Sequence, residues 1–149
     1  HKNISLIFVG DGILRGKLEK YAEENNLKNV HFVGFKNQTE LPEYYVISEI
    51  LVLPSGEGET WGLVVNEAMC FGLPVIASDR VGCGPDLIRQ GENGYIFQVG
   101  NIDELAKKLE IIFDEVKMKK FGKKSFEIIK NYSYKNDIKG IFQSIDFVG

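Results

Sequence analysis

The 149-residue chain has little of several features that mark particular classes of protein. It contains only two cysteines, Cys70 and Cys83, whose spacing fits neither a CxxC motif nor a metal site. We therefore expect free, partly buried thiols in a reducing compartment. No apolar run approaches the ~18 residues that a membrane span needs, and no signal peptide is visible. A cytoplasmic location is the resulting expectation.

Positive charge is not in excess, since the net charge is −3. Without a global basic field, we expect no nucleic-acid partner. One basic run, residues 117–124, places Met118 and Phe121 on the inner face of an expected amphipathic helix. We expect water to solvate its lysine side. The lysines leave open a weak, peripheral contact with the anionic inner face of a membrane.

Groups for acid–base or metal chemistry are scarce. The chain has two histidines, His1 and His31, and His31 lies within a strand-like apolar run, where we expect a packed or surface side chain. No Ser/His/Asp or Cys/His arrangement and no cluster of metal ligands is readable in the sequence. The chemistry of this protein must therefore be sought in other residues.

The pattern along the chain predicts an α/β fold in a single domain, residues 1–149. Apolar runs without polar interruption alternate with amphipathic segments, which indicates a parallel sheet covered on both faces. The predicted strands are residues 4–9, 30–33, 50–53, 75–77 and 95–97. The predicted helical segments are residues 14–24, 40–46, 62–71, 85–89, 102–116, 118–129 and 137–147. We predict a Rossmann-like, doubly wound parallel sheet with a C-terminal helical tail.

Sheets of this kind bind ligands outside the carboxyl ends of their strands. The loops expected at that edge are residues 10–13, 34–38, 54–61 and 78–84. All four contain glycine, which lets the backbone approach a ligand closely. This is consistent with a nucleotide or a phosphate, although glycine also simply forms turns.

Glu67 is the least expected residue of the predicted helix 62–71. Between Leu63 and Phe71 the only other polar side chain is Asn66. A helix that is apolar on nearly every face should be buried, and a carboxylate there is costly unless something donates hydrogen bonds to it. Glu67 therefore calls for a partner, either the protein backbone or a ligand.

Glu59 lies just before the start of the same helix, whose first free N–H groups, from Thr60 to Val64, form a ready site for an anion or a hydroxyl. A carboxylate accepts two hydrogen bonds at once, which suits the vicinal diol of a ribose or a sugar ring. The alternative is that Glu59 is a solvated loop residue and Glu67 a carboxylate at the edge of the core. The pattern alone leaves both interpretations open.

The stretch around these glutamates resembles the signature of the retaining GT-B glycosyltransferases of family 4. In that family seven residues separate the two glutamates, as they do between Glu59 and Glu67. The signature continues into Gly72-Leu-Pro-Val-Ile-Ala-Ser78. Further matches follow in the family's order: Phe8-Val-Gly-Asp-Gly12, Val30-His-Phe-Val-Gly34, Val81-Gly82, Pro85-Asp-Leu-Ile88 and Gly91-Glu-Asn-Gly94.

The resemblance implies the C-terminal, donor-binding half of a GT-B fold. It implies that Glu67 accepts the ribose hydroxyls of a nucleotide-sugar donor and that Glu59 contacts the donor sugar at the catalytic centre. The remaining donor-binding residues that it implies act mainly through their backbone: Thr60, Trp61, Gly62 and Leu63 at sugar or diphosphate, Val33, Gly34 and Phe35 along the nucleobase, and Gly10 and Gly12 at the border of the cleft. For the Trp61 side chain we expect packing within the loop.

Members of the family carry, before the strand that matches residues 4–9, a further strand, loop and helix that supply an Arg and a Lys to the diphosphate. That segment and the N-terminal acceptor domain are missing here, so we expect a fragment that is inactive by itself. The missing strand would be a central one, and its absence would leave a gap or an exposed edge. Arg15 and Arg80 lie nearest by loop position, but we expect both to be solvated.

The leading hypothesis is a retaining glycosyltransferase that moves a hexose-type sugar from a nucleotide sugar to a glycan or a lipid-linked acceptor. The resemblance implies that it needs no metal and no other cofactor. One alternative is a non-catalytic nucleotide- or sugar-binding module on the same scaffold, because fold alone does not decide function. Another is a different GT-B enzyme, such as a nucleotide-sugar epimerase.

Overall fold

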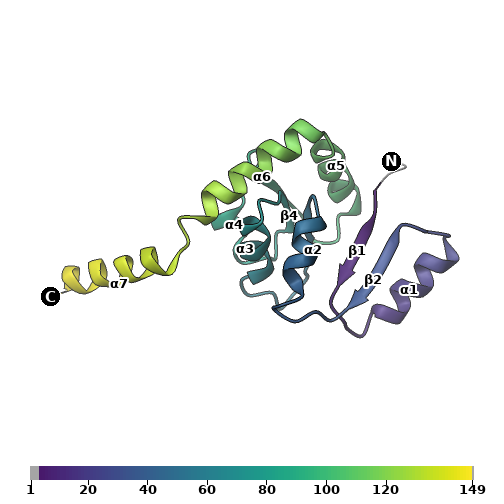
Figure 1. The fold of residues 1–149 in the computed structure, drawn as a ribbon, viewed down its shortest axis with the longest axis horizontal. Helices are drawn as coiled ribbons and strands as arrows, with labels where there is room; N and C mark the ends of the chain where they lie inside the picture. Colours follow the sequence, from purple (N-terminus) through teal and green to yellow (C-terminus); the bar gives the residue numbers. More distant parts are fainter. Residues whose placement is uncertain (1–3, 149) are drawn as a thin grey trace. The chain divides into compact units, whose positions relative to one another are not determined.

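The structure is a computed structural model that describes residues 4–148, so that His1 lies outside the described residues. The chain divides into two compact units, with the boundary between Ile47 and Ser48. Figure 1 shows the order of their helices and strands. Each unit is described by itself below. The expectation of a single domain stays a prediction.

The first unit is a β–α–β–α segment with a parallel strand pair. Its elements are β1 (Leu6–Val9), α1 (Arg15–Glu24), β2 (Val30–Gly34) and α2 (Leu41–Ile47). β1 and β2 pair in parallel, and the Phe8 and Phe32 rings stack with their centroids 4.9 Å apart. The register then moves from Phe32 to Gly34 and passes over Val33. The parallel pairing follows from the helical crossover α1 between the two strands.

The second unit has a three-stranded parallel sheet in the order β3–β4–β5. Its elements are β3 (Leu51–Leu53), α3 (Leu63–Cys70), β4 (Val75–Ser78), α4 (Gly84–Leu87), β5 (Gly94–Phe97), α5 (Ile102–Ile112), α6 (Glu115–Ile129) and α7 (Tyr134–Val148). All four residues of β4 are buried. A central strand covered on both faces explains why its sequence has no alternation of polar and apolar residues.

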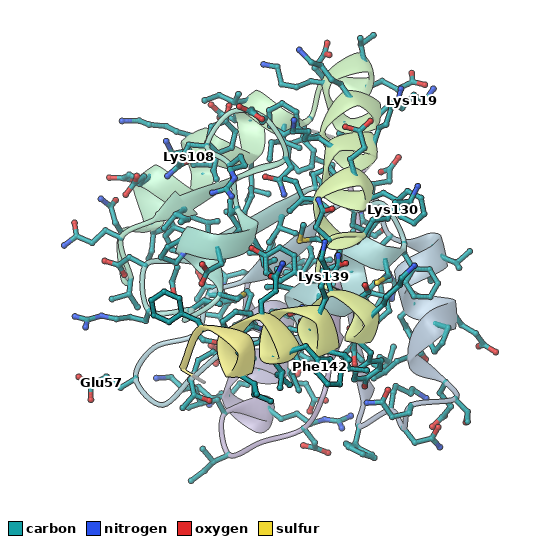
Figure 2. The ribbon with its side chains drawn as sticks, turned by 90° about the vertical axis from the view of Figure 1, so that its left-hand side faces the viewer. Glu57, Lys108, Lys119, Lys130, Lys139 and Phe142 are labelled. Carbon is teal, nitrogen blue, oxygen red and sulfur yellow. The ribbon has the colours of Figure 1, made fainter. Side chains whose placement is uncertain are left out.

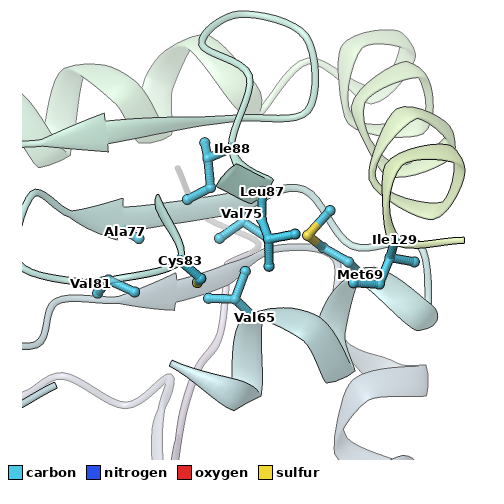
Figure 3. Packing of buried hydrophobic residues seen from close by; sticks show 9 residues of the cluster. All are labelled: Val65, Met69, Val75, Ala77, Val81, Cys83, Leu87, Ile88 and Ile129. Atoms are coloured by element: carbon cyan, nitrogen blue, oxygen red, sulfur yellow. The ribbon is translucent and has the colours of Figure 1, made fainter. Parts of the chain in front are cut away.

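The main core of the second unit lies between α3, β4, the α4 segment and α6. Figure 3 shows its nine buried residues: Val65, Met69, Val75, Ala77, Val81, Cys83, Leu87, Ile88 and Ile129. A second cluster joins Ile76 and Phe97 of the sheet to Ile112 of α5 and Phe121 of α6. The two clusters hold the helices against the sheet and thereby fix the loops at its edge.

The predicted C-terminal end of helix 102–116 is wrong. α5 ends at Ile112, and a new helix, α6, begins at Glu115. The reason is Asp114, whose carboxylate accepts a hydrogen bond from the N–H of Lys117 at 2.8 Å and caps α6. Val116, expected on the apolar face of the first helix, instead lies in the first turn of α6 and is 76% exposed.

The basic run forms the amphipathic helix that the sequence predicted. Phe121 is buried, Met118 packs against the second cluster, and Lys119 and Lys130 point outward on α6 (Figure 2). The large apolar residues of α7 from Tyr134 to Phe147 are exposed, among them Phe142, which Figure 2 labels. None of the helices within residues 4–148 combines the length and apolar character that crossing a bilayer requires.

The structure confirms the predicted fold class, parallel strands with interleaved helices and a C-terminal helix. The described strands form two sheets, however, and not one continuous sheet. Within residues 4–148, β1 pairs with β2 alone and β3 pairs with β4 alone. Each of these two strands thus has one partner, where an inner strand of a sheet has two.

Candidate functional site

The β3–α3 loop, residues 54–62, carries Glu59 at the carboxyl end of the sheet of the second unit. Glu59 is half-buried, whereas Glu57 at the tip of the same loop is exposed and points away from the protein (Figure 2). Thr60 is exposed as well. The two carboxylates of this loop therefore have different surroundings. Glu59 is partly covered by neighbouring residues, whereas Glu57 is open to solvent.

α3 begins directly after this loop at Gly62. This glycine is the N-cap, its φ is +92°, and no side chain caps the helix. A Cβ atom on Gly62 would lie 2.8 Å from a methyl group of Val81 and 3.2 Å from one of Leu53. Both the backbone angle and the space therefore require glycine. With no side-chain cap, the first N–H groups of the helix, beginning with Leu63, face the loop side as donors.

Glu67 lies in the second turn of α3 and is half-buried. The prediction that this helix is buried on nearly every face is wrong. Leu63, which shares the face of Glu67 four residues earlier, is 68% exposed, and Glu67 itself is half-buried. The buried face consists of Val65, Ala68 and Met69. Burial alone therefore does not force Glu67 to find a partner, and its case as a ligand residue depends on its position.

The other polar residue of α3, Asn66, holds Trp61. The indole Nε1–H of Trp61 donates a hydrogen bond to Oδ1 of Asn66 at 2.9 Å, and the ring packs against the main core. The side chain thus packs against α3 and the core, and it anchors the loop from there. A role of the Trp61 backbone in donor binding stays a prediction.

A second loop, residues 79–83 between β4 and α4, runs beside the first. The hydroxyl of Ser78 donates to the carbonyl oxygen of Ser55, and the N–H of Cys83 donates to the carbonyl oxygen of Trp61 at 2.9 Å. Gly82 lies against the backbone of Thr60. Sequence reasoning gave Ser78 and Gly82 no role of their own. The signal that could have found the first contact is a serine directly after the apolar run 75–77, where its hydroxyl needs a partner.

Cys83 is a buried thiol whose charge state depends on the site. Burial, together with a smaller effect of the negative charges of Glu59 and Asp86, raises its pKa to about 11. The thiol therefore stays protonated at neutral pH. It points to the carbonyl oxygen of Gly62 at 3.8 Å. Cys70, in contrast, is exposed, so that both cysteines are free as expected but only Cys83 is buried.

In the first unit, the structure brings two predicted glycines together at the carboxyl ends of β1 and β2. The N–H of Gly10 donates to the carbonyl oxygen of Gly34 at 2.8 Å. Both have positive φ angles, +128° and +73°. Gly12, two residues after Gly10 in the same loop, is exposed. Val33 is half-buried in β2, and Phe35 is 76% exposed. These residues belong to a different unit from Glu59 and Glu67.

Arg15 is not the purely solvated side chain that we expected. It forms ion pairs with Asp11 at 3.1 Å and with Glu19 at 2.8 Å, which raise its pKa. Its guanidinium lies beside Gly34, where a Cβ atom would be 3.1 Å from Nη1. The two carboxylates hold the guanidinium in place because both lie within hydrogen-bond reach.

Arg80 and His31 are exposed, as expected. Within the described part of the chain, His, Cys, Asp and Glu side chains form no group of three or more that is placed to hold a metal ion.

Comparison with known proteins decides the family. The sequence profile described as glycosyl transferases group 1 matches residues 1–128. The chain belongs to this family. An uncharacterized glycosyltransferase of Methanocaldococcus jannaschii is 33% identical over 134 residues, which cover 89% of this chain and 38% of that protein. The sulfoquinovosyl transferase of Arabidopsis thaliana is 35% identical over 134 residues, covering 87% of this chain and 25% of its own length.

A solved structure agrees with this placement. A TarM mutant of Staphylococcus aureus, crystallised with Fondaparinux, alpha-GlcNAc-glycerol and UDP, superimposes with a TM-score of 0.82 at 29% identity. The match covers 95% of this chain and 29% of that protein. This glycosyl transferases group 1 chain therefore spans well under half the length of these relatives.

Proposed function

We propose that this chain is the donor-binding domain of a retaining glycosyltransferase that moves a sugar from a nucleotide sugar to a glycan or a lipid-linked acceptor. The observation that carries the proposal is the geometry around α3. Glu59 and Glu67 lie on either side of a helix N-terminus that has a glycine cap and no side-chain cap, at the carboxyl ends of parallel strands.

Each group in this arrangement suits a part of the donor. The first N–H groups of α3 and the positive end of its dipole suit the anionic diphosphate. The Glu67 carboxylate, one turn further along the exposed face, suits the ribose diol because it accepts two hydrogen bonds. Glu59, at the loop end of the helix, suits the hydroxyls of the sugar. The backbone of residues 60–63 provides the remaining donors.

The first unit carries the part of the proposal that concerns the nucleobase. The backbone turn of Val33, Gly34 and Phe35 would run along the base, and Gly10 and Gly12 would lie at the border of that binding surface. The hydrogen bond between Gly10 and Gly34 supports this, since it gives the two loops one defined backbone arrangement. Arg15 lies beside Gly34, with its charge offset by Asp11 and Glu19.

The comparisons support the donor class. The TarM complex contains UDP, and the Arabidopsis relative is named for the transfer of a sulfoquinovosyl group. In the proposed retaining reaction the donor phosphate helps to deprotonate the acceptor, so neither glutamate need act as a nucleophile. The cations that stabilise the leaving diphosphate, and a further strand for an open sheet edge, would come from a preceding segment of a longer protein.

Titration of the 149-residue chain with UDP-glucose, GDP-mannose and ADP-glucose tests the proposal. We expect one of these donors to bind and Glu67→Ala to weaken that binding roughly tenfold or more, because a hydrogen bond to a charged group contributes about 1.5–3 kcal/mol. Glu57→Ala is the matched control, since Glu57 is exposed on the neighbouring loop. Equal binding by wild type and Glu67→Ala would remove Glu67 from the site.

A non-catalytic binding module is the alternative. Both hypotheses predict the same result for the donor titration. They predict different results for sugar transfer by a longer protein that contains this chain. There we expect sugar transfer with retention at the anomeric carbon, measured by NMR of the product, and loss of transfer in Glu59→Gln. Donor binding without any transfer by the longer protein would favour the module. Transfer by the 149-residue chain alone would contradict the need for a preceding segment.

A further inference from the structure

The β4–α4 loop attaches to the β3–α3 loop at two points that lie on either side of Glu59. At the start of the β3–α3 loop, the Ser78 hydroxyl donates to the carbonyl oxygen of Ser55. At its end, the N–H of Cys83 donates to the carbonyl oxygen of Trp61 at 2.9 Å. The backbone that carries Glu59 is therefore held from a neighbouring loop and not by contacts of its own alone.

Between these two points, Gly82 of the β4–α4 loop lies directly against the backbone of Thr60. A Cβ atom added to Gly82 would lie 1.9 Å from the carbonyl oxygen of Thr60 and 2.9 Å from its carbonyl carbon. Both neighbours are backbone atoms, so no side chain can rotate away to make room. The φ angle of Gly82 is not in the left-handed region. Space, and not backbone conformation, is what restricts this position to glycine.

We propose that Gly82 is a positioning residue for the donor sugar. It lets the Thr60–Trp61 peptide pack against the β4–α4 loop. This contact sets the orientation of Glu59, which precedes the peptide, and of Gly62, the N-cap of α3, which follows it. Gly82 itself is exposed and contributes no side chain to the core. Its effect on a ligand therefore passes through the neighbouring loop.

This inference rests on the proposed function and makes it more specific. Glu59 and Thr60 adjoin the contact, whereas Glu67 lies in the second turn of α3, which is held by the buried face of the helix. A displaced Thr60–Trp61 peptide should therefore weaken contacts to the sugar more than contacts to the ribose. The quantity that reports this is the ratio of the dissociation constants for a nucleotide sugar and for its free nucleoside diphosphate.

Gly94 provides a matched control. A Cβ atom there would also lie 1.9 Å from a backbone carbonyl oxygen, that of Val75, but the contact is between β4 and β5. Gly94→Ala and Gly82→Ala thus introduce the same steric conflict at different places. Gly56→Ala, in the β3–α3 loop, meets nothing within 4 Å and shows what an added methyl group does without a conflict.

The experiment measures the binding of UDP-glucose, GDP-mannose and ADP-glucose, each beside its own nucleoside diphosphate, to wild type and to the three variants. For the donor that wild type binds, we expect Gly82→Ala to lose roughly tenfold in affinity for the sugar form and much less for the diphosphate, as loss of one charged hydrogen bond would produce. Gly94→Ala and Gly56→Ala should leave the ratio of the two constants unchanged.

Ser78→Ala keeps the inference testable if Gly82→Ala does not fold. It removes the hydroxyl that holds Ser55 and creates no steric conflict, so we expect the same change of ratio with a smaller size. An unchanged ratio in the folded variants, or an equal change in Gly94→Ala, overturns the inference while the proposed function stands. Wild-type protein that binds none of the six probes overturns the proposed function instead.

Discussion

The indole N–H of Trp61 donates a hydrogen bond to the side-chain oxygen of Asn66 at 2.9 Å, and so joins the β3–α3 loop to α3. Trp61 is the only tryptophan of the chain. Tryptophan fluorescence therefore reports on the surroundings of the β3–α3 loop. The contact also accounts for Asn66, one of the two polar side chains in an otherwise apolar helix.

Asn66→Ala should destabilise the chain by about 1–2 kcal/mol, because it leaves the half-buried indole N–H without its acceptor. Urea unfolding followed by Trp61 fluorescence measures this loss. Asn66→Asp is the control, since it keeps an oxygen at the same position and should retain most of the stability. A full loss in Asn66→Asp, or none in Asn66→Ala, would show that the hydrogen bond does not hold the loop.

The two thiols should differ in reactivity. Cys70 is exposed, while Cys83 is buried with its pKa raised to about 11. Because the thiolate is the reactive form, a thiol reagent at pH 8 should modify Cys70 quickly and Cys83 only after unfolding. Counting modified thiols in native and denatured protein, with Cys70→Ser as the reference, checks this. Rapid modification of native Cys70→Ser would place Cys83 nearer to solvent.

Stability should fall in alkaline solution through Cys83. Its thiol ionises near pH 9.0 in the unfolded chain and near pH 11 in the folded protein. Between these values the unfolded state has released a proton that the folded state keeps, so the contribution is complete below pH 9.0 and is lost as the pH rises to about 11.

The measurement is the difference in unfolding free energy between wild type and Cys83→Ala as a function of pH. Other groups that titrate in alkaline solution cancel in this difference. We expect the difference to shrink from pH 9.0 to about 11. A constant difference over that range would mean that the thiol ionises equally in both states.

Asn93 should be among the most sensitive polar positions of the second unit. It is fully buried, accepts a hydrogen bond from the N–H of Arg89 at 2.6 Å, and donates to the carbonyl oxygen of Leu87 at 3.0 Å. Asn93→Ala should lower the free energy of unfolding by about 3 kcal/mol, because two buried backbone groups lose their hydrogen-bond partners. Thermal unfolding followed by circular dichroism measures it.

Asn101→Ala provides the comparison for that variant. Asn101 is exposed and caps α5 by accepting a hydrogen bond from the N–H of Glu104 at 3.0 Å. Loss of such a cap costs about 1 kcal/mol, so this variant should be clearly more stable than Asn93→Ala. The reverse order would contradict the account of the buried network.

Local patterns predicted much of the fold. The uninterrupted apolar run that became β4 and the helical spacing that became α6 each depend on residues close together in the chain. The end of α5 was predicted wrongly because the spacing of apolar residues continued through the cap, Asp114. The capping hydrogen bond, and not the apolar pattern, decides where a helix begins.

The candidate site was predicted only in part. The sequence placed Glu59 in a loop and Glu67 in the following helix, as the structure has them, but the apolar composition of α3 suggested a burial that Leu63 does not have. Composition cannot show which face of a helix finds a partner. The contact of Gly82 with Thr60 was not predictable either, since it joins residues from two loops that only the pairing of β3 with β4 brings together.

By itself, the sequence determined the alternation of strands and helices, the two glutamates and their spacing, since these follow from residue identity and short-range periodicity. The tertiary structure alone decided the half-burial of Glu67, the anchoring of Trp61 by Asn66, and the support of the Glu59 loop by Ser78, Gly82 and Cys83. The physical reason is that burial and loop-to-loop contacts depend on non-local packing, which arises only when the parallel strands have paired.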